Sequence, residues 1–192
     1  MAKVILESIE EYYHFYPQIA AVITAKAGDK ANAMAAAWHS AISFKPPIYG
    51  VAIAPKRYTC QLVLEGGQFA VNFLPFEAAE LIASVGGSSG SEVDKFHRFN
   101  IEVEPPLKIA APILKDAYAS YECRLIGHHL YGDHQWLVGE VVAIHMRGEA
   151  FTHQHILDLA RVKPALYLGA EYYTTADSGM VCFLDRQVYG KR

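Results

Sequence analysis

The chain has 192 residues, of which 52% are hydrophobic and 19% are charged, and its formal net charge at pH 7 is −3. This length suits one domain with a substantial core, and the absence of any basic run argues against nucleic acid as a partner. The first residues carry acids where a signal peptide needs an apolar core, and no apolar run is long enough to span a bilayer, so we expect no membrane association.

The first predicted elements form a hairpin near the N-terminus. Residues 19–24 are apolar and β-branched, which predicts a strand, and residues 27–30 (Ala-Gly-Asp-Lys) predict a tight turn. Residues 31–40 would be the return strand, although their alanines favour a helix by propensity alone. We interpret them as a strand because the turn sets up a reversal and Pro46-Pro47 prevents a helix from continuing.

The rest of the chain alternates further short strands with two short helices. Alternating apolar residues predict the strands, and capping and stop residues predict the helices. The expected strands cover residues 48–54, 69–73, 117–126, 136–145 and 166–168, and the expected helices cover residues 59–65 and 77–85. Many strands at short intervals with few helices indicate an all-β fold built as a closed barrel. We treat residues 1–192 as a single domain, with 1–18 as an N-terminal extension and 176–192 as a C-terminal arm.

Three cysteines, Cys60, Cys123 and Cys182, are widely spaced and form no CxxC pair. An odd number of isolated cysteines favours free, mostly buried thiols in a reducing compartment over a disulfide framework. Together with the lack of a signal peptide or membrane span, this predicts a cytoplasmic protein.

A candidate anion site lies at the start of the predicted helix 59–65. Thr59 is expected to cap this helix, whose first backbone N–H groups are unpaired and carry a partial positive charge. Arg57 adds a cation that can bind a phosphate through two N–H groups, and Ser40 and Ser43 can add hydroxyl donors from the preceding strand end. An isolated Arg-x-Thr would more simply be a capped helix with an exposed arginine.

The run before this helix favours a ligand over the simpler interpretation. Residues 32–40 read Asn-Ala-Met-Ala-Ala-Ala-Trp-His-Ser, so small side chains, an indole and polar groups are collected in one short segment. Met34 and Trp38 should share one face of the strand because their separation is even, although a core position is an equal alternative for Met34. The mixture suits a flat aromatic ligand that carries a phosphate.

The other chemistry-bearing residues form no known motif. The glycine-rich loop 86–90 lacks both nucleotide-binding fingerprints. The histidines of the turn expected near residues 128–134, and those at His153 and His155, are not at structural-zinc spacing, so we expect no metal site. We also find no serine-hydrolase, Cys–His or paired-carboxylate motif, which leaves a hydrolytic site without a motif as an open alternative.

Several segments together resemble the flavin reductase-like family of FMN-binding split barrels, which includes the flavoredoxins. The matching segments are residues 32–40, 43–47, 57–59, 67–72 (Gly-Gln-Phe-Ala-Val-Asn), 94–96 and 164–173. The resemblance covers most of the chain, but not the first twenty residues or those after Thr175. It implies a six-stranded antiparallel split barrel of Greek-key type with a few short flanking helices, usually as a homodimer.

The resemblance also implies roles for particular residues around FMN. Contacts along the isoalloxazine are implied for Trp38, His39, Ser40 and Ala41, although relatives vary at the position of His39. The ring border and ribityl chain would be contacted by Asn32, Met34 and Ser43. The phosphate would be held by Arg57, Thr59 and Lys95, and Tyr173 would close the site. The chemistry itself would take place on the flavin, so the resemblance implies no catalytic side chain.

Barrel size supports the expectation of a homodimer. An eight-stranded barrel barely holds one small ligand, so a six-stranded barrel must be filled by side chains and a flavin must lie outside it. A partner subunit could supply the second wall, and the aromatic content of 12% provides side chains for it. A well-filled core is the alternative explanation of these aromatics.

Two functions from different classes remain open at this point. The first is a flavin reductase that passes hydride from NADH or NADPH to flavin, with an oxygenase or another redox protein as a further partner. The second is a flavoredoxin-like carrier that keeps FMN and exchanges electrons with protein partners. A barrel whose flavin site has decayed, or holds another ligand, is a third interpretation.

Overall fold

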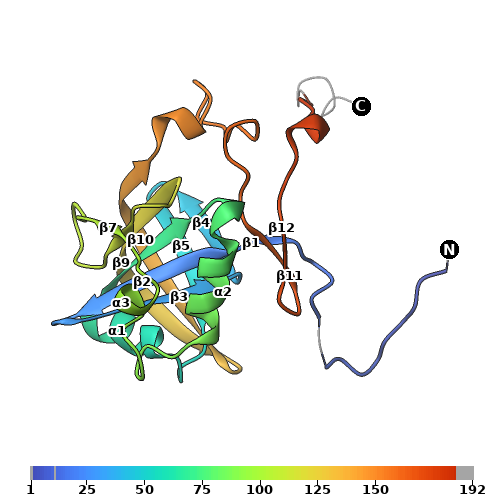
Figure 1. Cartoon of the computed structure of the whole chain (residues 1–192). Coiled ribbons are helices and arrows are strands. Elements are labelled where there is room, and N and C mark those ends of the chain that lie inside the picture. Colours follow the sequence, from blue (N-terminus) through green and yellow to red (C-terminus); the bar gives the residue numbers. More distant parts are fainter. Residues whose placement is uncertain (1, 11, 185–192) are drawn as a thin grey trace.

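The computed structural model describes residues 2–10 and 12–184, and its centre is an antiparallel sheet of seven strands (Figure 1). The strand order is β3-β2-β6-β9-β10-β5-β4. In chain order these strands are β2 (Ala21–Ala27), β3 (Lys30–Ala36), β4 (His39–Phe44), β5 (Pro47–Ile53), β6 (Gln68–Phe73), β9 (Ala119–Tyr131) and β10 (His134–Met146). The expected all-β class with few short helices is confirmed, whereas the expected number of six strands is too low by one.

The extra strand arises because the predicted strand 31–40 is broken. β3 ends at Ala36 and β4 begins at His39, yet these two strands lie at opposite edges of the sheet. A link as short as Ala37 and Trp38 can join the two edges only if the sheet curls until they approach each other, which gives a split barrel. Trp38 stays attached to β5, since its carbonyl oxygen accepts from the backbone N–H of Ala52 at 2.8 Å. The prediction that Met34 and Trp38 share one strand face is therefore wrong.

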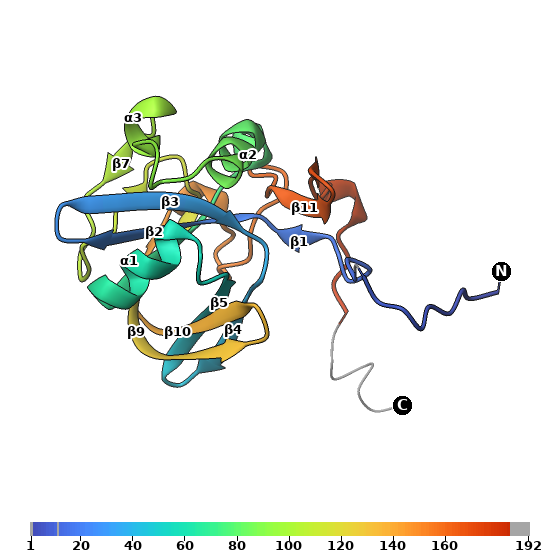
Figure 2. The ribbon, with the colours of Figure 1, turned by 90° about the horizontal axis from the view of Figure 1, so that it is seen from below.

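Two small sheets and three helices surround the barrel. The small sheets contain β1 (Gln18–Ile19), β11 (Leu166–Gly169) and β12 (Tyr172–Thr174) in one, and β7 (Val103–Glu104) and β8 (Ile113–Leu114) in the other. The helices are α1 (Tyr58–Gly66), α2 (Ala79–Gly87) and α3 (Lys95–Arg98), with single 3₁₀ turns at Phe76–Ala78, Gly148–Ala150 and Ser178–Met180. α1 packs on β2 and β3, and α2 and α3 pack against β3, so three helices meet at one edge strand (Figure 2).

Side chains fill the interior of the barrel. Phe69, Ile23, Val51 and Leu137 are fully buried in one cluster with several aromatic rings. Gly139 makes room for this packing, because a Cβ atom there would lie 2.8 Å from the ring of Phe69. The core is thus too full for a ring-shaped ligand, which directs the search for a site to the outer surface.

The two predicted helices exist with shifted bounds. The helix expected at residues 59–65 is α1, which is capped by Gly67 in the left-handed conformation (φ 66°). The Gly67 N–H donates to the carbonyl of Val63. The helix expected at residues 77–85 divides into a 3₁₀ turn and α2, which continues to Gly87. The glycine-rich segment therefore supplies the last turn of α2, and the loop begins only at Ser88.

The hairpin β9–β10 is longer than predicted. Its strands run to Tyr131 and from His134, so Gly132 and Asp133 alone form the turn between them. His128 and His129 consequently lie on strand β9 and His134 begins β10, so the turn itself contains no histidine. No group of three or more potential metal ligands is found among the described residues.

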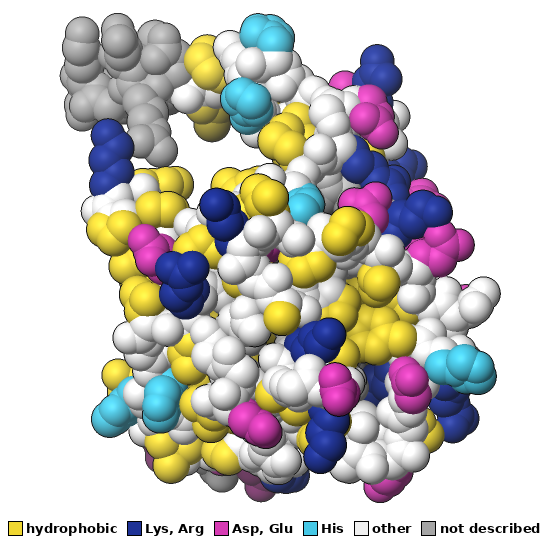
Figure 3. Space-filling model, turned by 90° about the vertical axis from the view of Figure 1, so that its left-hand side faces the viewer, with side chains coloured by type: hydrophobic (Ala, Val, Ile, Leu, Met, Phe, Trp, Pro, Cys, Tyr) yellow, Lys and Arg dark blue, Asp and Glu magenta, His cyan; other side chains and the backbone are white. Residues whose placement is uncertain are grey.

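The chain ends extend away from the barrel (Figures 1 and 2). The expected N-terminal extension (residues 1–18) ends in β1, which pairs with β11 beside the main sheet. Of the expected C-terminal arm, the 3₁₀ turn Ser178–Met180 is seen, while residues 185–192 lie outside the described residues. On the face shown in Figure 3, cationic and anionic side chains are interspersed between exposed apolar patches. None of the described helices is long and apolar enough to cross a membrane.

Candidate functional site

A groove runs along the edge strand β3 and consists of three hollows that share Ala35 and Arg57 in their walls. The first hollow, of about 220 Å³, lies among β3, the start of α1, the end of α2 and α3. The second, of about 600 Å³, lies between β3, α2 and the β11–β12 hairpin. The third, of about 330 Å³, lies between the ends of β3 and β5 and the start of β10. One extended ligand can occupy more than one of them.

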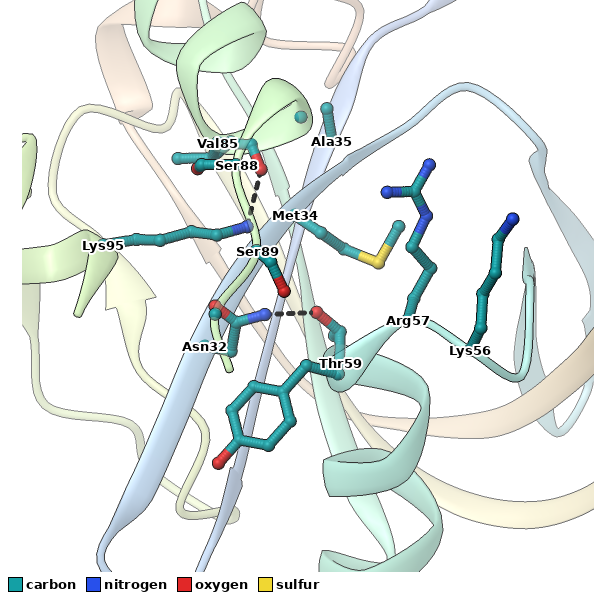
Figure 4. A pocket seen from close by; sticks show the side chains of 13 residues that line it. Asn32, Met34, Ala35, Lys56, Arg57, Thr59, Val85, Ser88, Ser89 and Lys95 are labelled. Atoms are coloured by element: carbon teal, nitrogen blue, oxygen red, sulfur yellow. Dashed lines mark hydrogen bonds between the residues drawn. The ribbon is translucent and has the colours of Figure 1, made fainter. Parts of the chain in front are cut away.

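The first hollow is cationic (Figure 4). Three cations line it, Lys56, Arg57 and Lys95, and its described lining contains no carboxylate. Lys95 is only 3% exposed, and its ammonium donates to the backbone carbonyls of Ala33 (2.8 Å) and Val85 (2.7 Å). An ammonium has three hydrogens, so one donor remains for a ligand. A buried cation without an acidic partner is costly unless an anion completes the site.

Burial and the neighbouring charge of Arg57 lower the pKa of Lys95 to about 8. Both effects act in the same direction, because removal from water and a like charge each disfavour the ammonium. A bound phosphate would oppose them, since an opposite charge nearby favours the charged form. The protonation of Lys95 is therefore coupled to the charge of whatever occupies the first hollow.

The start of α1 forms another wall of the first hollow. Arg57, and not Thr59, is the N-cap residue, so the prediction that Thr59 caps this helix is wrong. The backbone N–H groups of Tyr58 and Thr59 come before any i−4 carbonyl of the helix and are free to bind an anion. The hydroxyl of Thr59 instead accepts a hydrogen bond from the side-chain amide of Asn32 at 2.8 Å.

The loop after α2 forms a further wall of the first hollow. Ser88, Ser89 and Gly90 line it, and the sequence analysis did not assign them a role. A Cβ atom on Gly90 would lie 2.1 Å from the amide oxygen of Asn32, so only glycine lets the loop approach so closely. The sequence Ser88-Ser89-Gly90 was the one signal that could have indicated a polar loop beside the first hollow.

The second and third hollows are lined largely by small and aromatic side chains. Both have Ala36, Ala37 and Tyr167 in their walls, and small side chains leave room for a flat ring on this strand. Trp38 lies in the third hollow and donates from its indole nitrogen to the hydroxyl of Tyr16 at 2.9 Å. Tyr173 lies in the second hollow, so two of the predicted aromatic residues are at this end of the groove.

The structure brings together seven of the eleven residues that the sequence analysis singled out. Those lining the groove are Asn32, Met34, Trp38, Arg57, Thr59, Lys95 and Tyr173. Those outside all three hollows are His39, Ser40, Ala41 and Ser43. The last four belong to β4, at the other edge of the sheet, because the chain leaves β3 at Ala37.

His39 has a structural place of its own. Its two ring nitrogens lie 2.7 Å from the hydroxyl of Tyr49 and 2.9 Å from the carbonyl oxygen of Ile19. Burial lowers the pKa of His39, which keeps the imidazole neutral. Ser40 directs its hydroxyl to the carbonyl of Ala41. Within one chain, the side chains of His39, Ser40, Ala41 and Ser43 on β4 therefore do not line the hollow that contains Arg57 and Thr59.

The residues present fit a ligand with the parts of FMN. The first hollow offers cations and free backbone N–H groups without a competing carboxylate, as a phosphate requires. The adjoining hollows offer alanines and aromatic rings, as a flat ring system requires. Fold and groove together define a split barrel whose outer groove suits an anionic, ring-containing ligand.

This chain belongs to the flavin reductase-like family, because the sequence model of the flavin reductase like domain matches residues 13–176. Its fold is similar to that of an FMN-binding protein from Thermus thermophilus with bound 1-cyclohex-2-enone (TM-score 0.85, 30% identity, 96% of this chain and 99% of that one). A flavoredoxin from Methanosarcina acetivorans is also similar (TM-score 0.83, 27% identity, 95% and 96%). The FMN reductase (NADH) RutF 1 of Methylorubrum extorquens is 34% identical over 109 residues, which are 57% of this chain and 52% of that protein.

Proposed function

We propose that this protein binds FMN in the groove along β3 and transfers hydride from NADH or NADPH to flavin. The observation that carries the proposal is the buried ammonium of Lys95, which lies in a hollow whose described lining contains cations and no carboxylate. Membership of the flavin reductase-like family and the similarity to an NADH-dependent FMN reductase support this assignment.

The residues of the first hollow hold the phosphate in this proposal. Lys95 donates through its third hydrogen, and Arg57 donates from the opposite wall (Figure 4). The N–H groups of Tyr58 and Thr59 add two backbone donors at the start of α1. Because the hydroxyl of Thr59 already accepts from Asn32, its own hydrogen is available to a ligand oxygen.

The remaining hollows orient the ring system and shield it from water. Bound FMN supplies the capacity to accept a hydride and to pass electrons on, so no acid–base pair is needed from the chain. Ala35, Ala36 and Ala37 form a floor whose small side chains let a ring lie close to the backbone. Tyr167 and Tyr173 exclude water from the side of the β11–β12 hairpin.

The alternative is an FMN electron carrier, which the similarity to a flavoredoxin favours. Purified protein reconstituted with FMN and treated with NADH or NADPH in the absence of oxygen separates the two functions. Rapid bleaching of the yellow colour by either nucleotide supports the reductase. A yellow protein that neither nucleotide bleaches supports the carrier, and a protein that cannot be reconstituted with flavin contradicts both.

We also propose that the protein works as a homodimer. Neighbouring strands of the main sheet leave large apolar side chains in solvent, and Phe44 is 90% exposed. Further exposed side chains on these strands are those of Ile42, Ile126, Leu130, Tyr131, Ile144 and Met146, each between 42% and 66% exposed. A second copy would cover them and place a second wall beside the groove. Sedimentation that gives a monomer with FMN fully bound would contradict the dimer.

A further inference from the structure

The side chain of Tyr16 lies in the wall of the third hollow, and its hydroxyl is held by a hydrogen bond from Trp38. The indole of Trp38 has one N–H, and it donates this hydrogen to the Tyr16 oxygen at 2.9 Å. The phenol oxygen is therefore an acceptor in this pair, and its own hydrogen must point elsewhere. Within residues 2–10 and 12–184, this is the one hydrogen bond that the Tyr16 hydroxyl makes.

The ring of Tyr16 is held on several sides, so its hydroxyl cannot easily turn away. Tyr13 stacks on it at 5.5 Å between centroids, and Tyr167 meets it edge-on at 5.6 Å. Such aromatic contacts stabilise the position of the ring beyond the area that they bury. Burial also raises the pKa of Tyr16, so the group stays protonated at neutral pH and is a donor.

The side chains that line the rest of the third hollow suit a planar ring. Trp38 and Tyr167 provide aromatic walls, and Ala36 and Ala52 provide small side chains. His134 closes the hollow from β10, with its ring 4.7 Å from that of Trp38 and its Nδ1 2.7 Å from the carboxylate of Asp133. The cations of this hollow, Lys56 and Arg57, are those that it shares with the first hollow.

We propose that the Tyr16 hydroxyl donates a hydrogen bond to a carbonyl oxygen at the edge of a planar ring in the third hollow. It thereby selects rings that carry a carbonyl over hydrocarbon rings of the same shape. The inference rests on the proposed function, because that function brings ring ligands to the groove. The carbonyl can belong to the flavin itself or to a second ring that binds beside it, and the two sources are separable by experiment.

The test compares Tyr16→Phe with a matched control, Tyr13→Phe. Tyr13 lies in the same segment and stacks on Tyr16, but it does not line the third hollow. Acetophenone and ethylbenzene are the ring probes, since they share a phenyl ring with a two-carbon side chain and only acetophenone carries a carbonyl oxygen. Their affinities for the FMN-loaded protein are measured by ligand-observed NMR, and the affinities of FMN and riboflavin for the flavin-free protein are measured by fluorescence titration.

If the carbonyl belongs to a second ring, the wild type should bind acetophenone about three- to tenfold more tightly than ethylbenzene, the range expected for one neutral hydrogen bond. Tyr16→Phe should abolish this preference, leave ethylbenzene unchanged and leave both flavins unchanged. If the carbonyl belongs to the flavin, Tyr16→Phe should instead weaken FMN and riboflavin by the same factor.

The proposal is overturned if Tyr16→Phe changes neither the ketone preference nor flavin affinity, or if Tyr13→Phe has the same effect as Tyr16→Phe. A wild-type protein that binds no flavin is a different result, because it contradicts the proposed function. Repeating the ketone comparison on the flavin-free protein then still tests Tyr16 on its own.

Discussion

The side-chain amide of Asn32 donates to the hydroxyl of Thr59 at 2.8 Å, and both residues are buried. This bond joins β3 to α1 across 27 positions of sequence. It fixes which way the Thr59 hydroxyl hydrogen can point, because the oxygen already accepts from Asn32. The loop residue Gly90 packs directly against the same amide. Three segments of the chain therefore meet at one pair of side chains beside the cationic hollow.

Gly90→Ala should disturb this meeting point. The new methyl group would lie 2.1 Å from the amide oxygen of Asn32, so the loop or the amide must move. Overpacking of this kind typically costs about 1–3 kcal/mol of stability, and displacement of Asn32 should also weaken FMN binding. Urea unfolding and flavin titration measure the two effects. Gly127→Ala is the matched control, since a Cβ atom there meets nothing within 4 Å, and equal losses in both variants would contradict the argument.

Arg57→Ala should weaken FMN binding and spare riboflavin, which has no phosphate. A hydrogen bond to a charged group is worth about 1.5–3 kcal/mol, so the affinity for FMN should fall about 10- to 100-fold. Because Arg57 is solvent-exposed in the free chain, the lower part of this range is expected. Fluorescence titration of both flavins measures the effect.

The control for this variant is Arg98→Ala. Arg98 lies on α3 over the ring of Phe99 and lines none of the three hollows, so its loss should leave both flavins bound. If Arg57→Ala weakens FMN and riboflavin equally, the arginine supports the fold of the site and does not bind phosphate.

FMN affinity should fall as the pH rises above about 8. The pKa of Lys95 is lowered to about 8, so below this pH the free protein already carries the ammonium that the phosphate requires. Above it, a proton must be taken up on binding, and the affinity should fall by at most about tenfold per pH unit. Titrations between pH 7 and 10 measure this, and riboflavin should show no such step.

Lys95→Met serves as the control for the pH effect. It should bind FMN more weakly at pH 7 and lose the dependence on pH above 8, because no group remains to be protonated in the hollow. A variant that keeps the full pH dependence would show that another group titrates.

Local patterns predicted most of the strands and, of the three cations in the first hollow, Arg57. Lys95 was indicated only by the family resemblance, and Lys56 was missed. The alternation at residues 69–73 gave β6 within one residue, and the Thr59 region gave α1 within one residue at each end. The break between β3 and β4 was not predictable in this way, because Ala37 and Trp38 are not turn residues. It is imposed by the barrel, whose two edges they join.

The aromatic end of the groove depends on contacts that no local pattern encodes. Tyr16 and Tyr167 are 151 positions apart, yet their rings meet because β1 pairs with β11. The place of Ser88 and Ser89 in the first hollow was likewise not predicted. A glycine-rich loop has no preferred local conformation, and the position of this loop is set by the packing of Gly90 against Asn32.

Glu122, a fully buried carboxylate on β9, is also fixed by residues that are distant in the sequence, and it lies in no sequence motif. It accepts from the backbone N–H groups of Leu107 and Lys108, both at 2.6 Å, and from Nε2 of His145 at 2.5 Å. Burial raises the pKa of Glu122, but the hydrogen bonds from Leu107, His145 and Lys108 outweigh burial and hold the pKa below its usual value. The charged form is therefore the one that the fold stabilises.

Glu122→Gln should destabilise the protein by about 2–3 kcal/mol at pH 7, because a neutral amide cannot replace an acceptor of several charge-assisted hydrogen bonds. The pKa of Glu122 is lower in the folded than in the unfolded state, so its contribution is complete above the unfolded pKa and is lost as the pH falls through the folded pKa. The stability difference between wild type and variant should therefore shrink in acid.

Urea unfolding at pH 7 and below pH 4 measures this difference. The exposed Glu65→Gln is the control, and it is expected to stay within about 0.5 kcal/mol of wild type. A difference that persists undiminished in acid would mean that Glu122 acts through its shape and not its charge.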